Sequence, residues 1–190
     1  TEALAEIRGK TRRKFARLLP QKPEKSGWRE LLLPLLLDGF AEEAQQHDPA
    51  LLASLVGAGI LAAGQERYSL TVLAIRLEQD GKNRTTPDMA YTVDMLLGKL
   101  CRSRSVYSGG RLLTLLIAEE EPRGLELAID ELRQSFARVL ELRAIVGISH
   151  PFTSFCRCHA ASREAVDAQR FAGESGIYHI SQIAAESGTA

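Results

Sequence analysis

The residues of this chain with the clearest potential for chemistry follow a pair of glycines, Gly109-Gly110, that separates two β-rich runs. A glycine pair supplies the positive φ angles that a two-residue hairpin turn requires, so the sequence predicts a turn here. The next three positions are Arg111, Leu112 and Leu113. Condensing nucleoside triphosphates needs divalent cations held by carboxylate oxygens, and these positions offer none. The Arg111 guanidinium suits a phosphate group, or it is a solvated side chain beside a turn.

Two further arginines, Arg102 and Arg104, lie shortly before this turn. Together with Arg111 they form a candidate contact for an anionic ligand, because guanidinium groups make strong charge-assisted hydrogen bonds to anions. The sequence does not fix whether the three side chains share one face of a sheet.

Cysteine and histidine gather where Cys156, Cys158 and His159 follow His150. Zinc binding is one interpretation, but Cys-x-Cys differs from the two-residue spacing that is usual in zinc knuckles. Together with Cys101 the cysteines form an odd set with no disulfide framework. Reduced thiols that pack as small apolar side chains are the other interpretation, and we expect no metal site.

Apolar patterning predicts the strands that would position these residues. The β-branched, apolar run over 68–78 predicts a long strand in the middle of a sheet. The hairpin covers 106–117, a buried strand covers 142–148, and 178–180 is expected to form a short strand at the edge.

Helices are predicted by apolar faces at helical spacing near residues 2–19, 28–37, 49–56, 87–100, 122–140 and 155–172. Pro34 should kink or end the helix that contains it, because proline lacks the amide hydrogen. The last helix presents a face of small residues that should let it approach the sheet closely: Cys158, Ala161, Ala165 and Ala168.

The order strand, helix, hairpin, helix, strand, helix, short strand predicts an α/β (α+β) fold with a mostly antiparallel sheet and packed helices. This is the nucleotide-cyclase-like variant of the ferredoxin architecture. Residues 1–64 would form an N-terminal helical extension for linkage or signalling, and residues 65–190 the sheet domain. One stripe of the first helix is a candidate dimer interface, or it packs onto its own domain: Leu4, Ile7, Phe15 and Leu18.

Lysine and arginine number 24 and so do aspartate and glutamate, so no global field draws the chain to nucleic acid or anionic lipid. One local cluster could contact nucleic acid, although it is more typical of the solvated face of a helix: Arg8, Lys10, Arg12, Arg13, Lys14 and Arg17. No run approaches the roughly 20 apolar residues of a membrane span, and no signal segment opens the chain. We expect a cytoplasmic protein without membrane contact.

Three segments together carry a family resemblance: the hairpin, Gly-Ile-Ser-His-Pro-Phe over 147–152, and Ala-Ala-Ser-Arg-Glu-Ala over 160–165. Over about residues 66–182 the chain resembles the degenerate GGDEF-like domain in the middle of AraC-type transcription regulators. These include response regulators with an N-terminal receiver, and the sugar-diacid and purine-catabolism regulators are related.

Two positions separate this chain from the cyclases that make a cyclic dinucleotide. Those enzymes carry Gly-Gly-Asp-Glu-Phe at the turn, where this chain reads Gly-Gly-Arg-Leu-Leu over 109–113. They also carry an acid in the first strand, where this chain has Arg76, with Glu78 and Asp80 only at the end of the strand. Both metal-holding positions therefore lack their acid.

The resemblance implies a non-enzymatic domain, without cofactors, that transmits signals or dimerises in a two-component transcription regulator. The expected partner is a second copy of the chain, and DNA would be contacted only by a C-terminal helix-turn-helix part outside it. The alternative is a ligand-sensing domain that binds a nucleotide or a small anionic metabolite without turnover. A working cyclase is least favoured, because the magnesium ligands are missing.

Overall fold

The computed structural model describes residues 27–38, 49–173 and 176–187. Its strands are β1 (Ser69–Gln79), β2 (Lys82–Asn83), β3 (Arg102–Ser108), β4 (Arg111–Ala118), β5 (Arg143–Ile148) and β6 (Ile177–His179). They form one six-stranded sheet in the order β3-β4-β1-β5-β6, with β2 paired to the end of β1. All pairs are antiparallel except β5 with β6. The predicted α/β fold with a mostly antiparallel sheet is confirmed.

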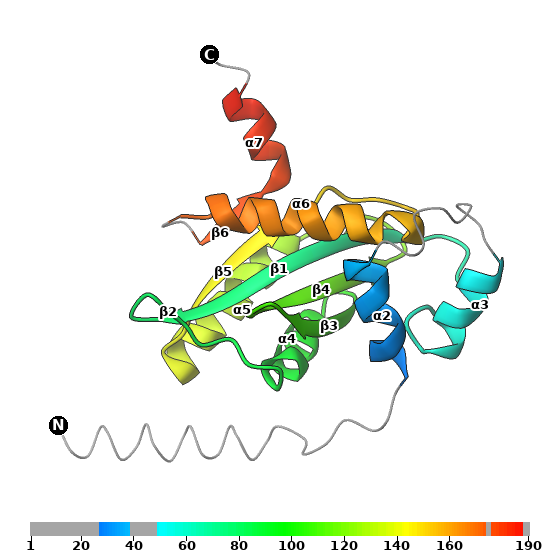
Figure 1. The fold of residues 1–190 in the computed structure, drawn as a ribbon, viewed down its shortest axis with the longest axis horizontal. Coiled ribbons are helices and arrows are strands. Elements are labelled where there is room, and N and C mark those ends of the chain that lie inside the picture. The colour runs from blue at the N-terminus through cyan, green and yellow to red at the C-terminus, as the bar shows by residue number, and fades with distance from the viewer. Residues whose placement is uncertain (1–26, 39–48, 174–175, 188–190) are drawn as a thin grey trace.

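The helices are α2 (Trp28–Leu37), α3 (Pro49–Gly57), α4 (Met89–Leu97), α5 (Leu125–Leu140), α6 (Cys158–Phe171) and α7 (Ile180–Ser187), with a 3-10 turn, η1 (Phe155–Arg157), before α6. Helices α4 and α5 cover one face of the sheet, and α6 crosses the other, with α2 packed against it (Figure 1). Helix α3 contributes to the same apolar cluster as α6. The first predicted helix, with its apolar stripe and its basic cluster, lies outside the described residues.

The central strand β1 is buried on both faces. Leu70 and Val72 pack toward α2 and α6, whereas Leu73 and Ile75 pack toward α4 and α5. A strand covered on both sides contains a nearly continuous apolar run instead of an alternating one. This confirms the predicted strand and its place in the middle of the sheet.

The predicted glycine turn joins β3 to β4. Gly109 and Gly110 both have positive φ, 57° and 77°, and Ser108 pairs with Arg111 across the turn. The Asn83 side-chain amide, from the β2 arm, donates a hydrogen bond of 2.6 Å to the Gly110 carbonyl. The arm therefore holds the turn in place from one side.

Helix α6 lies very close to the sheet, as its small residues predicted. Cys158 and Ala165 are completely buried. Gly147 of β5 faces the helix, and a Cβ added there would overlap backbone atoms of Ala165 and Gln169. The Gln169 side chain in turn donates to the Ile145 carbonyl of β5 at 3.2 Å. Backbone contact and a buried hydrogen bond thus fix the position of α6.

The N-terminal helices pack into the same apolar cluster as α6. Leu36 and Leu55 are fully buried there, and the His159 ring nitrogen lies 3.0 Å from the Leu36 carbonyl. Pro34 does not end α2, because the helix continues to Leu37 and the Asp38 amide donates to the Pro34 carbonyl. Burial of the helix outweighs the one hydrogen bond that proline removes.

Two elements were not predicted from the sequence, the short β2 arm and helix α7. Helix α7 follows β6 directly and projects away from the sheet (Figure 1). Among the described residues, no helix has the length and apolar character needed to cross a membrane.

Candidate functional site at the hairpin turn

The sheet register brings together the two positions that lack an acid. Ile75 of β1 pairs with Leu112 of β4, so one step further along the two strands Arg76 comes opposite Arg111. Side chains alternate between faces, and Ala74 and Leu113 both pack in the cluster beneath α6. Arg76 and Arg111 therefore lie on the α6 face of the sheet, side by side.

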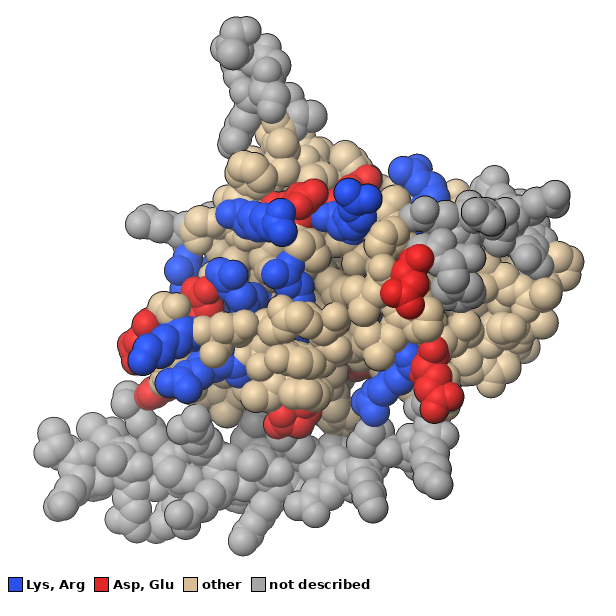
Figure 2. All heavy atoms as spheres, in the orientation of Figure 1, with Lys and Arg blue, Asp and Glu red and all other residues tan. Residues whose placement is uncertain are grey.

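Helix α6 adds two more arginines, Arg163 and Arg170, to this region. A hollow of about 420 Å³ lies between the turn and the helix, and we call it the arginine hollow; its polar lining includes Ser108, Arg111, Ser162, Arg163, Asp167 and Arg170. Lysine and arginine side chains gather on this face of the molecule, over α6 and the strands beside it (Figure 2). Elements distant in sequence thus contribute positive charge to one place.

Arg111 lies in a partly buried and positively charged environment. Burial lowers the pKa of Arg111 and the guanidinium groups of Arg170 and Arg76 lower it further. Glu78 pairs with Arg76 at 2.6 Å, and Asp167 pairs with Arg170 at 3.2 Å. Within the described part of the chain, no acidic side chain pairs with Arg111.

The side chains at the other two motif positions, Leu112 and Leu113, point into the protein core. Leu112 is 0 % exposed and Leu113 is 2 % exposed, on opposite faces of β4. Neither offers an oxygen to a cation. In the three described segments, no three histidine, cysteine, aspartate or glutamate side chains come together as metal ligands. The turn can therefore attract an anion, but it provides no ligand set for Mg²⁺.

No protein-family model, curated protein or solved structure matches this chain. The resemblance to GGDEF-like regulators accordingly stays a prediction that rests on the motif residues. The arginine hollow, in contrast, is described by the geometry of the chain itself.

Arg102 and Arg104 do not join Arg111. They lie on β3 away from the turn, and their side chains hydrogen bond to the carbonyls of Ile60 at 3.5 Å and Gly59 at 3.1 Å. Arg104 also bonds the Ser103 carbonyl and lies over the Trp28 ring, with its guanidinium carbon 5.6 Å from the ring centroid. These two arginines tie the loop after α3, and α2 itself, to the hairpin.

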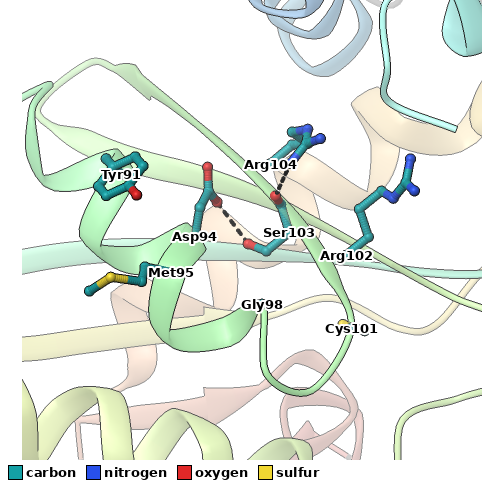
Figure 3. A pocket seen from close by; sticks show the side chains of 8 residues that line it. All are labelled: Tyr91, Asp94, Met95, Gly98, Cys101, Arg102, Ser103 and Arg104. Carbon is teal, nitrogen blue, oxygen red and sulfur yellow. Dashed lines mark hydrogen bonds between the residues drawn. The ribbon is translucent and has the colours of Figure 1, made fainter. Parts of the chain in front are cut away.

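A second hollow, of about 440 Å³, lies between α4 and β3 and contains Asp94 (Figure 3). Asp94 accepts hydrogen bonds from the hydroxyls of Ser103 and Ser105, at 2.8 and 2.7 Å, and from the Ser105 amide at 3.1 Å. The Ser105 hydroxyl is also 2.7 Å from that of Thr114. Both serines are hydrogen bonded to the carboxylate, and among the described residues no histidine or lysine is hydrogen bonded to either of them. This cluster attaches α4 to the edge strand β3.

The cysteine and histidine residues of the zinc interpretation point to different surroundings. Cys158 is fully buried in the core beneath α6, where its apolar environment raises the pKa of the thiol. His150 contacts Glu164 at 3.2 Å, whereas His159 contacts the Leu36 carbonyl of α2. The predicted role of Cys158 as a small apolar packing residue is confirmed.

Sequence reasoning singled out Arg111 but missed Arg163 and Arg170. The sequence predicted α6 from the apolar face of the helix, and the arginines on its other face were not considered as site residues. The available signals were an arginine inside the apolar run of β1, and two arginines seven residues apart on α6, which places them on one side of the helix.

Proposed function

We propose that this chain is a non-catalytic regulatory domain of a cytoplasmic transcription regulator, and that its function is signal transmission and dimerisation. A C-terminal helix-turn-helix part outside this chain would bind the DNA. One observation carries the non-catalytic assignment: Arg76 and Arg111 lie side by side where the resembling cyclases have acids. Two guanidinium groups repel Mg²⁺ and leave the phosphates of a triphosphate without their metal.

The packing of α6 supports a role in transmitting signals. Helix α2 packs against α6 near one end of the sheet, and α6 in turn contacts β6 and α7. The three helices form a continuous path from the N-terminal part of the described chain to its C-terminal part (Figure 1). A displacement of α2 would reach α7 through α6, which is the small helix shift that many switching proteins use.

Incubation of the protein with nucleoside triphosphates and Mg²⁺ tests the non-catalytic assignment. We expect no cyclic dinucleotide above the level of a reaction without protein, because the described site has no carboxylate set to hold the metal. Chromatography of the products over several hours is the measurement. A cyclic dinucleotide formed in proportion to protein concentration would overturn the assignment.

The solution mass tests the proposed dimer. Sedimentation should give twice the 20.9 kDa of one chain. Ile7→Asp should shift the mass to that of a monomer, because a charge in the apolar stripe is costly to bury in an interface. Arg12→Glu, which changes charge outside the stripe, should leave the dimer intact. A monomeric parent chain would contradict dimerisation.

A further inference from the structure

We propose that the arginine hollow binds an anion that carries two or more phosphate groups. The positive charge in the hollow comes from Arg111 of the sheet on one side and from Arg163 and Arg170 of α6 on the other. Arg76 does not line the hollow, but its guanidinium group lies near that of Arg111 and adds to the positive field there. The inference rests on this geometry and holds whether or not the domain regulates transcription.

The hollow holds more positive charge than its own acids neutralise. Its described lining contains three arginines, Arg111, Arg163 and Arg170, and one acid, Asp167, which is already paired with Arg170. Arg111 and Arg163 have no acidic partner among the residues that the structure describes. Holding partly buried like charges together costs free energy, and a bound anion recovers it.

One buried donor on the same face is also unused. The Arg76 Nε atom is buried and has no hydrogen-bond partner within the described residues. Arg76 is fixed by its 2.6 Å contact with Glu78, and its side chain is 38 % exposed. An anion bound to Arg111 in the hollow would therefore lie near a second guanidinium group that is already positioned.

The shape of the hollow favours an extended anion over a single phosphate. Arg163 and Arg170 are seven residues apart, which is about 10 Å along a helix. The volume of about 420 Å³ falls within the usual range of small-molecule sites. Ser108 and Ser162 supply hydroxyl donors, and guanidinium groups bind phosphate oxygens through two hydrogen bonds at once.

Calorimetric titration with pyrophosphate tests this site, with EDTA present so that no metal bridges the anion. We expect saturable binding by the parent chain, at least about tenfold tighter for pyrophosphate than for orthophosphate. Arg111→Gln should weaken pyrophosphate binding by at least about tenfold, the scale of one charge-assisted hydrogen bond. Arg138→Gln, an exposed arginine on α5 across the sheet, is the matched control and should change affinity less than twofold.

A second variant changes affinity in the opposite direction. Asp167→Asn removes the carboxylate that competes for Arg170, so pyrophosphate should bind about threefold more tightly. This gain cannot arise from misfolding. Absence of binding by the parent chain, or equal effects of Arg111→Gln and Arg138→Gln, would overturn the proposal. Because the titration contains neither metal nor nucleotide, its failure is independent of the cyclase assay.

Discussion

Gly147→Ala is expected to destabilise the protein by about 3 kcal/mol or more, the upper range of overpacking in a core. The added Cβ would overlap the Ala165 carbonyl oxygen and the Gln169 amide nitrogen, and would lie 2.8 Å from the Gln169 Cα. All three atoms belong to the backbone of α6, so no side-chain rotation relieves the overlap. Urea denaturation followed by circular dichroism measures the loss.

Gly57→Ala is the matched control for this prediction. Gly57 ends α3, nothing lies within 4 Å of an added Cβ, and its φ is not positive. Alanine there should leave the free energy of unfolding unchanged or raise it slightly, because alanine restricts the unfolded chain. Equal stability of the two variants would show that α6 does not press on β5 as described.

The same contact links stability to the arginine hollow. Helix α6 holds Arg163 and Arg170 opposite Arg111, and Gly147 sets how closely the helix approaches the sheet. A bulkier residue at 147 would push α6 outward and widen the hollow. The small residue is therefore needed for the core and for the geometry of the site.

Most of the sheet was predictable because each strand has a local signal. The apolar run of β1 identified the central strand, and the adjacent glycines Gly109 and Gly110 identified the hairpin. Both glycines have positive φ in the structure, as the turn requires. The β2 arm had no such signal, because Lys82 and Asn83 are both exposed and their pairing depends on β1. Pro34 wrongly suggested that α2 would be interrupted. The helix continues because it is buried against α6, and such tertiary packing has no local signal in the sequence.

The candidate site was only partly predictable. Arg111 was identified because it directly follows the glycine turn. Its grouping with Arg102 and Arg104 did not take account of the length of β3, which separates those two from the turn. Arg170 is distant in sequence, and only the packing of α6 on the sheet brings it near Arg111. Proximity of that kind is a property of the fold and leaves no local pattern.

Asp94→Ala is expected to cost about 3 kcal/mol of stability. Asp94 accepts three hydrogen bonds from Ser103 and Ser105, and removing it leaves the Ser105 amide of the edge strand without that acceptor. An unsatisfied buried donor costs about 1–3 kcal/mol, and hydrogen bonds to a charged group are stronger than neutral ones. Asp88→Ala is the control, because Asp88 is exposed at the start of the same helix and makes no capping hydrogen bond.

The pH dependence distinguishes the charge of Asp94 from its hydrogen bonds. Burial raises the pKa of Asp94 above its ordinary 3.8, although the Ser105 and Ser103 donors and Arg104 act in the opposite direction. The folded state therefore binds the proton more tightly than the unfolded state, and this contribution to stability is complete below pH 3.8. It is lost as the pH rises through the raised pKa.

Asp94→Asn keeps an oxygen acceptor at this position but does not titrate. Relative to this variant, the parent chain should lose stability as the pH rises from 3.8 through the raised pKa, and the difference should then become constant. Urea denaturation of both proteins at a series of pH values measures it. A difference that stays flat, or that changes in favour of the parent chain, would mean that hydrogen bonding to Ser105 and Ser103 outweighs burial. Asp94 would then be a stabilising ionised anchor, and the raised pKa would be wrong.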